Sequence, residues 1–168
     1  MSTKTTLVIS DIQFPFHDSL MLSKIIKVAE EIQPDAILQI GDGIDFPQVS
    51  RWTKGTAGEY EGTLQKHIDG FRSTALRPLR EAAPEAKITW LQGNHDLRLH
   101  EFVKTYAAPL GPLRALEMTS LFGLDDLAID YKKGPLRVGT NVLAIHGHES
   151  GGYSTSASAW DQKFAKRY

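Results

Sequence analysis

The chain has 168 residues, of which 41% are hydrophobic, and its 19 basic and 20 acidic side chains leave a formal net charge of −1. This length suits one domain with a sizeable core, and the near-neutral charge gives no general attraction for nucleic acid or an anionic membrane. The chain contains no cysteine, which excludes disulfides, thiolate metal sites and a cysteine nucleophile. Its apolar runs are about five residues long, far short of the roughly 20 that a membrane helix needs. We therefore expect a soluble, cytoplasmic protein without a signal peptide.

Four short apolar runs predict buried strands, because each is bounded by polar or glycine residues. They cover residues 6–10, 36–40, 88–91 and 142–145. Segments with helical spacing separate the first three, and this alternation favours an α/β sandwich of mostly parallel central strands flanked by helices. We expect a single domain over residues 1–168.

Two amphipathic helices are predicted between these strands. The first covers residues 22–32 and begins behind Asp18 or Ser19 as its N-cap. The second covers residues 64–79, where Pro78 should kink or end the helix one residue earlier, because proline lacks an N–H and clashes with the preceding turn.

Two connections are longer than the predicted sheet requires. Residues 43–59 carry Trp52 beside two basic side chains, and residues 97–126 form a helical excursion that contains Tyr106. Loops of this length usually act as lids or binding surfaces. The alternative is that the two aromatic side chains cover the core, and the pattern leaves both interpretations open. A final helix is expected within residues 154–168.

A polar cluster follows each of the four strand-like runs. The clusters are Asp11-Ile12-Gln13, Gly41-Asp42-Gly43-Ile44-Asp45, Gly93-Asn94-His95-Asp96 and His146-Gly147-His148. Because the carboxyl ends of parallel strands meet in one crevice of an α/β sheet, we expect these clusters to converge. Their carboxylates, amide oxygen and imidazoles suit a divalent ion such as Mn²⁺, Mg²⁺, Fe²⁺ or Zn²⁺. Two such ions about 4 Å apart clamp a phosphoryl group and activate a water, so that no protein nucleophile is needed.

In this order, the motifs D-x-[H/Q], G-D-x-x-D, G-N-H-D and H-G resemble those of the calcineurin-like metallophosphoesterases, in particular the small phage-type or bacterial members. The resemblance extends from residue 7 to residue 152. It implies a metal-dependent hydrolase that cleaves a phosphomonoester or phosphodiester through a metal-activated water. The implied ligands are Asp11 for the first metal, Asp42 as the bridge between two metals, and Asn94 and His146 for the second metal.

The resemblance also implies a catalytic imidazole, His95, paired with the carboxylate of Asp45. Such a pair keeps an imidazolium charged, so that it can protonate a leaving alkoxide or stabilise phosphoryl charge. Arg98 lies four residues after Asn94, where its guanidinium could clamp the substrate phosphate with two hydrogen bonds. A solvated surface arginine is the alternative.

The chain departs from the family pattern at two places. Gln13 stands where the family usually has a histidine, and as a ligand its amide oxygen would favour Mg²⁺ or Mn²⁺ over Zn²⁺; otherwise it is a hydrogen-bond donor behind the ligands. The family's G-H-x-H motif, which gives a histidine to each metal, is absent from the 168 residues. Either the chain stops before the strand that carries this motif, or the site is incomplete. His148 then either supports the ligands or itself approaches a metal.

Three functional hypotheses follow. The first is a phosphoesterase with two divalent ions, Mn²⁺ or Mg²⁺ before Fe²⁺ or Zn²⁺. The second is a nuclease or cyclic-nucleotide phosphodiesterase of the same fold, although the net charge argues against action on long duplexes. The third is a non-catalytic binding or scaffold protein with one metal or none. We expect a phosphate ester as the ligand and no membrane partner; the sequence carries no signal for the oligomeric state.

Overall fold

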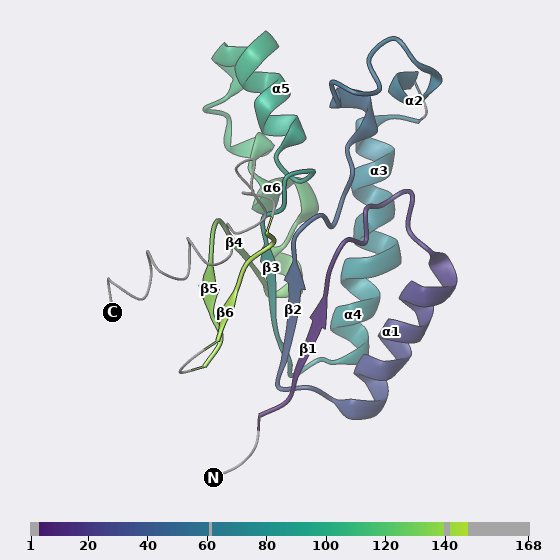
Figure 1. Cartoon of the computed structure of the whole chain (residues 1–168), viewed down its shortest axis with the longest axis vertical. Coiled ribbons are helices and arrows are strands. Elements are labelled where there is room, and N and C mark those ends of the chain that lie inside the picture. The colour runs from purple at the N-terminus through teal and green to yellow at the C-terminus, as the bar shows by residue number, and fades with distance from the viewer. Residues whose placement is uncertain (1–3, 61, 140–141, 148–168) are drawn as a thin grey trace.

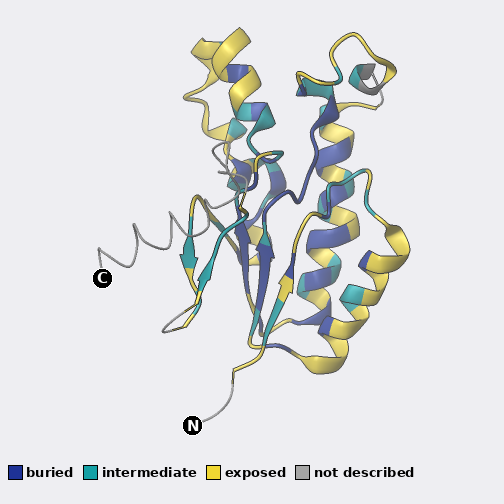
Figure 2. Ribbon diagram, in the orientation of Figure 1, coloured by how far each residue is buried: buried dark blue, intermediate teal, exposed yellow. Residues whose placement is uncertain are grey.

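The computed structural model describes residues 4–60, 62–139 and 142–147. Its centre is a parallel sheet in the order β1-β2-β3-β4 (Figure 1). The strands are β1 (Thr6–Ile9), β2 (Ala36–Ile40), β3 (Lys87–Leu91) and β4 (Ile129–Lys132). Strands β2 and β3 lie in the middle and are buried along most of their length (Figure 2), which explains why they are nearly continuous apolar runs in the sequence. The first three strand predictions are therefore confirmed.

Helix α1 (Ser19–Ile32) confirms the first helix prediction and its cap. The carboxylate of Asp18 accepts hydrogen bonds from the backbone N–H groups of Leu20 and Met21, each at 2.9 Å. These bonds satisfy two of the donors that every helix start leaves without an intrahelical partner. The helix ends at Gln33, whose φ of 43° is left-handed.

The second predicted helix is a rod of three parts: α3 (Leu64–Phe71), the π-helical segment η2 (Arg72–Leu76) and α4 (Arg77–Ala82). The predicted end of the helix near Arg77 is wrong; what precedes the proline is the π-helical interruption η2, which stops at Leu76. The rod nevertheless continues for another turn, because Pro78 lies in the first turn of α4, where a missing N–H costs little. Helices α1, α3 and α4 line one side of the sheet (Figure 1).

Aromatic rings fill the core where this helical layer meets the sheet. Phe71 of the rod, Trp90 of β3 and Phe122 of the 97–126 excursion meet edge to face, with ring centroids 5.2–5.8 Å apart. All three side chains are almost completely buried. This packing fixes β3, and with it the polar residues that follow the strand, against the helical rod.

The fourth strand prediction was wrong in its pairing. Within residues 142–145, β6 (Leu143–Ala144) pairs antiparallel with β5 (Leu136–Arg137) in a separate two-stranded sheet. This hairpin lies on the opposite side of the main sheet from α1 and α4 (Figure 1). The fourth parallel strand is β4 instead, which the sequence analysis missed because its residues alternate between buried and exposed positions and contain no continuous apolar run.

Both long connections rise beyond the carboxyl ends of the strands (Figure 1). The first forms η1 (Pro47–Val49) and α2 (Ala57–Tyr60). The second is helical, as predicted, and contains α5 (Arg98–Tyr106), η3 (Ala108–Leu110), η4 (Arg114–Leu116), α6 (Met118–Phe122) and η5 (Asp125–Leu127). None of the helices in the described part of the chain has the length and apolarity to cross a membrane. The helix expected within residues 154–168 and the position of His148 lie outside the described residues.

Candidate metal centre

The loops that follow β1 and β2 are joined by backbone hydrogen bonds. The N–H of Asp11 donates to the carbonyl of Gly41 at 3.2 Å, and the N–H of Gln13 donates to the carbonyl of Asp42 at 2.9 Å. The first two polar clusters are thus held side by side at the carboxyl edge of the sheet, as the parallel topology predicts.

Three residues of the first two polar clusters have left-handed backbone conformations that side-chain-bearing residues rarely adopt. The φ angles are 52° for Asp11, 50° for Gln13 and 54° for Asp42. Each such conformation costs free energy and persists only where surrounding contacts impose it, a pattern that is concentrated at functional sites. The strain therefore marks this edge of the sheet as more than a connection.

The predicted ligands converge above this edge. Asp11, Asp42 and His146 offer ligand atoms that all lie within 4.8 Å of one another. The Nε2 atom of His146 is 3.2 Å from Oδ2 of Asp42 and 3.1 Å from Oδ1 of Asn94. Although β6 does not belong to the main sheet, the residue that follows its hairpin reaches the same point as the other three clusters.

The hydrogen bonding of His146 prepares this cluster for a cation. Its Nδ1 atom lies 2.7 Å from the carbonyl oxygen of Ile40, and because a carbonyl only accepts, we assign the ring proton to Nδ1. The lone pair of Nε2 then faces the oxygens of Asp42 and Asn94. Three acceptor atoms this close repel one another unless a cation or a proton lies between them. The set of oxygen and imidazole donors fits a hard or borderline divalent ion.

Two glycines allow the loops to approach so closely. A Cβ atom at Gly93 would lie 2.1 Å from Oδ1 of Asp42 and 2.3 Å from its backbone nitrogen. A Cβ atom at Gly41, where φ is +99°, would lie 2.4 Å from Nδ1 of His146. No larger residue fits at either position without displacing a predicted ligand.

His95 and Asp45 are in contact beside the ligands. Nδ1 of His95 forms a hydrogen bond with Oδ1 of Asp45, and the backbone N–H of His95 donates to Oδ1 of Asp42 at 2.8 Å. The structure therefore brings together the two residues that the sequence pairs, and it ties them directly to the central carboxylate. Their catalytic role remains a prediction.

Arg98, the predicted phosphate clamp, is held against this pair. Its Nη1 atom lies 2.9 Å from Oδ2 of Asp45 and donates to the carbonyl of the same residue at 2.7 Å. Its Nη2 atom is 3.1 Å from Nε2 of His95. Because a guanidinium only donates, Nε2 accepts and the imidazole is neutral in this arrangement. The imidazolium expected from the sequence would require Arg98 to move away from Nε2.

Asp96 organises the centre, a role that the sequence analysis did not assign. The residue is fully buried, and burial raises the pKa of its carboxyl to about 6, although the hydrogen bonds that it accepts oppose this rise. Its two oxygens accept from five N–H groups, those of the Asp42, Gly43, Ile44 and Gly93 backbones and the Trp90 indole. An acidic residue that directly follows predicted site residues at the end of a buried strand was the only sequence signal for this role.

Gln13 and His148 complete the predicted set. Gln13 is half-buried and bonded through its backbone to Asp42, so the residue adjoins the centre, and its role as a ligand remains a prediction. His148 lies outside the described residues. Among the described residues, the cluster that offers ligands is therefore formed by Asp11, Asp42, Asn94 and His146.

Comparison with known proteins agrees with this geometry. The model of the family described as calcineurin-like phosphoesterase matches residues 4–166. The Gene 54 proteins of Mycobacterium phages L5 and D29 are each 30% identical to this chain over 158 residues, which cover 94% of this chain and 62% of theirs. The chain thus spans less than two thirds of the length of these relatives. With nearly all of its length matched, the chain belongs to the calcineurin-like phosphoesterase family.

Proposed function

We propose that the protein is a metal-dependent phosphoric ester hydrolase that acts on a phosphomonoester or phosphodiester in the cytoplasm, a reducing compartment with which a chain free of cysteine is compatible. The observation that carries this proposal is the convergence of Asp42, Asn94 and His146. Nε2 of His146 lies 3.2 Å from an oxygen of Asp42 and 3.1 Å from the side-chain oxygen of Asn94. Such a donor set has little use without a cation, and the family to which the chain belongs uses cations for phosphoester hydrolysis.

Asp42 is the natural bridge between two ions. It is almost completely buried, and it offers a ligand atom within 4.8 Å of those of Asp11 and His146; His146 in turn contacts Asn94. When bound, divalent ions would polarise the phosphate ester and acidify a water for in-line attack. The predominance of oxygen donors favours Mn²⁺ or Mg²⁺.

His95 and Arg98 are placed to manage charge and protons next to these ligands. Nε2 of His95 lies 3.7 Å from Oδ2 of Asp42, so the imidazole borders the site where the phosphate would bind. Asp45 orients the ring through Nδ1, so that Nε2 is the atom that exchanges a proton with the leaving oxygen once Arg98 has moved away from it. Arg98 contributes a positive charge beside the developing phosphoryl charge.

Hydrolysis assays with purified protein test the proposal. We expect hydrolysis of bis-p-nitrophenyl phosphate or p-nitrophenyl phosphate that requires Mn²⁺, is weaker with Zn²⁺ and stops with EDTA. Asp42→Asn should reduce kcat/KM by more than about 100-fold, because replacing a ligand should cost more than the 10–100-fold typical of a residue behind the ligands. Asp69→Asn, at an exposed carboxylate of α3, is the matched control and should match the wild type.

Two other outcomes would change the assignment. Hydrolysis that survives both EDTA and Asp42→Asn would reject the metal centre. Mn²⁺ binding that depends on Asp42, without hydrolysis of either ester, would favour the binding or scaffold hypothesis instead.

A further inference from the structure

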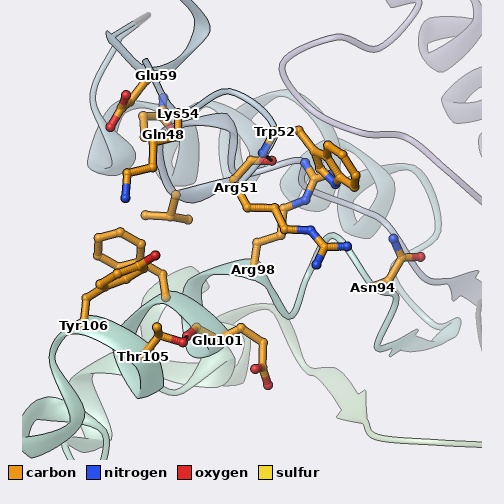
Figure 3. A pocket seen from close by; sticks show the side chains of 13 residues that line it. Gln48, Arg51, Trp52, Lys54, Glu59, Asn94, Arg98, Glu101, Thr105 and Tyr106 are labelled. Atoms are coloured by element: carbon orange, nitrogen blue, oxygen red, sulfur yellow. Dashed lines mark hydrogen bonds between the residues drawn. The ribbon is translucent and has the colours of Figure 1, made fainter. Parts of the chain in front are cut away.

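A cleft of about 450 Å³ opens next to the metal centre, between the loop after η1 and helix α5. Its volume falls in the range of small-molecule sites. We call it the aromatic cleft. Figure 3 shows Asn94 at one end, Trp52 and Arg98 between the two ends, and Tyr106 toward the other end. Because Asn94 and Arg98 belong to both places, a ligand whose phosphate lies at the metal centre would extend into this cleft.

The aromatic side chains of the cleft do not cover the core. Trp52 is 73% exposed and Tyr106 is 64% exposed, so the core-covering alternative for these two residues is wrong. Phe102 lies beside Tyr106 with ring centroids 5.0 Å apart. Flat apolar faces exposed in a concave site suit stacking with a planar ligand group, which is how proteins hold unpaired nucleic-acid bases.

Cations accompany both exposed rings. The guanidinium of Arg51 lies 4.7 Å from the ring centroid of Trp52, and the ammonium of Lys54 lies 5.0 Å from that of Tyr106. Paired in this way, a ring and a cation provide a stacking face and a phosphate contact within one side-chain length of each other. This combination matches a nucleotide, in which a planar base and an anionic phosphate are joined by one sugar.

The acidic groups of the cleft limit its positive charge. Glu59 accepts a hydrogen bond from the backbone N–H of Gly55 at 2.5 Å, and Glu101 lines the cleft from α5. The cleft is also lined by three cationic side chains, those of Arg51, Lys54 and Arg98. With two carboxylates against them, the cleft carries only a small excess of positive charge. A long duplex, which is held mainly by its phosphates and has its bases already stacked, fits such a surface poorly.

We propose that the phosphate ester bound at the metal centre carries a nucleoside, whose base stacks on Trp52 in the aromatic cleft; where the ligand has a second phosphate, Arg51 or Lys54 contacts it. The inference rests on the proposed function for the position of the reacting phosphate. The nucleoside comes from a mononucleotide or from an unpaired nucleic-acid strand. Both sources share the same chemistry, a planar base next to a phosphate.

Binding without catalysis tests this assignment. Fluorescence anisotropy of a fluorescein-labelled single-stranded dT10 with phosphorothioate linkages, which resist hydrolysis, should show saturable binding by the wild-type chain in the presence of Mn²⁺. Trp52→Ala should weaken the affinity by roughly tenfold or more, because the stacked base loses its platform. Trp52→Phe, which keeps an aromatic ring, should keep most of the affinity. Trp52→Leu, which keeps an apolar side chain without a ring, should lose it, and the pair therefore shows whether stacking or apolar contact holds the base. Leu20→Ala, at an exposed position of α1 outside the cleft, should bind like the wild type.

Competition experiments distinguish the two sources. The two competitors are compared by the concentration, counted in nucleotides, that displaces labelled dT10. If thymidine 5′-monophosphate and unlabelled dT10 are equally effective, the site takes a mononucleotide. If unlabelled dT10 is much more effective, the site takes an unpaired strand. Either result supports the proposal. Wild-type protein that binds neither ligand at millimolar concentration, or Trp52→Ala that binds dT10 as tightly as the wild type, would overturn it.

Activity gives an independent readout that separates this inference from the proposed function. With thymidine 5′-p-nitrophenyl phosphate, Trp52→Ala should raise KM by roughly tenfold. With methyl p-nitrophenyl phosphate, in which a methyl group replaces the nucleoside, the same variant should show a much smaller change in KM. An equal loss with both substrates would contradict a base-binding role. A wild type that hydrolyses neither compound would defeat the proposed function, while the anisotropy experiment would still decide the nucleoside proposal.

Discussion

The metal centre and the aromatic cleft share Asn94 and Arg98 but are built in different ways. The contacts of the metal centre join residues far apart in the sequence, such as the bond between His146 and the carbonyl of Ile40, 106 positions away. The loop of the cleft is held by local bonds, such as that from the Thr56 hydroxyl to the carbonyl of Thr53. A substitution in the metal centre should therefore affect residues far away in the sequence, whereas a substitution in the cleft loop should affect only its neighbours.

The difference separates two tasks. The proposed chemistry needs ligand atoms fixed within tenths of an ångström, a precision that the strained loops of the centre would suit. Recognition of a ligand's remote part tolerates looser positioning, and exposed loops can vary without disturbing the sheet. Substitutions in the two regions test this contrast.

The largest effect is expected for His95→Ala. We expect kcat to fall by roughly 10²–10⁴-fold, because a group that exchanges a proton at the leaving oxygen contributes on this scale. The bond from the backbone N–H of residue 95 to Asp42 should persist, so the metal content measured by elemental analysis should not change. Loss of metal together with activity would instead make His95 a ligand or a structural support.

Asp96→Asn should disturb the metal centre although it replaces none of the predicted metal ligands. An asparagine presents an NH₂ group to N–H donors that now bond to a carboxylate oxygen, and each buried donor left without an acceptor costs about 1–3 kcal/mol. We expect the free energy of unfolding to fall by about 2–4 kcal/mol and Mn²⁺ affinity to fall by about 10–100-fold. Urea unfolding and isothermal titration measure the two effects. If Asp130→Asn, at a surface carboxylate of β4, lost as much, the special position of Asp96 would be refuted.

A pair of glycine substitutions compares the two regions directly. Gly93→Ala places a Cβ atom against Asp42. This overpacking should lower the free energy of unfolding by about 1–3 kcal/mol, and it should also weaken Mn²⁺ binding. Gly55→Ala in the cleft loop meets no atom within 4 Å but has a φ of +75°, so it should cost about 1 kcal/mol and leave Mn²⁺ binding intact. Equal losses of Mn²⁺ affinity would contradict the contrast between the regions.

The smallest effect is expected for the stability of Trp52→Ala. Because the side chain is 73% exposed, its removal should change the free energy of unfolding by no more than about 0.5 kcal/mol. Thermal unfolding followed by circular dichroism measures this change. A large drop in Tm would show that the ring supports the fold and would remove it as a dedicated binding surface.

Much of the sheet could be predicted from local sequence. Strands β1, β2 and β3 are apolar runs that end in turn-forming residues, and the parallel topology alone predicts that the polar groups after them converge. Strand β4 could not be found in this way, because Asp130 and Lys132 point to solvent and interrupt its apolar pattern. The antiparallel partner of β6 has only two residues, too few to leave a period in the sequence.

The functional residues divide along the same line. The convergence of Asp42, Asn94 and His146 was predictable because each follows a strand-like run and is of a residue type that can bind a metal. The role of Asp96 was not, because most of its partners are backbone N–H groups, among them those of Asp42 and Gly43, more than 50 positions away. Nor could the sequence decide whether Trp52 faces the core or the solvent, because a single aromatic residue in a long loop has no period to read.

The most direct test of the metal centre is an anomalous difference map from a crystal of the protein soaked in Mn²⁺. We predict a peak within about 2.0–2.6 Å of a carboxylate oxygen of Asp42, with Asn94 and His146 among its ligands. A second peak on the side of Asp11 would show the bridge between two ions. Peaks that occur only elsewhere in the molecule, with Asp42 and His146 binding no ion at saturating Mn²⁺, would contradict the account.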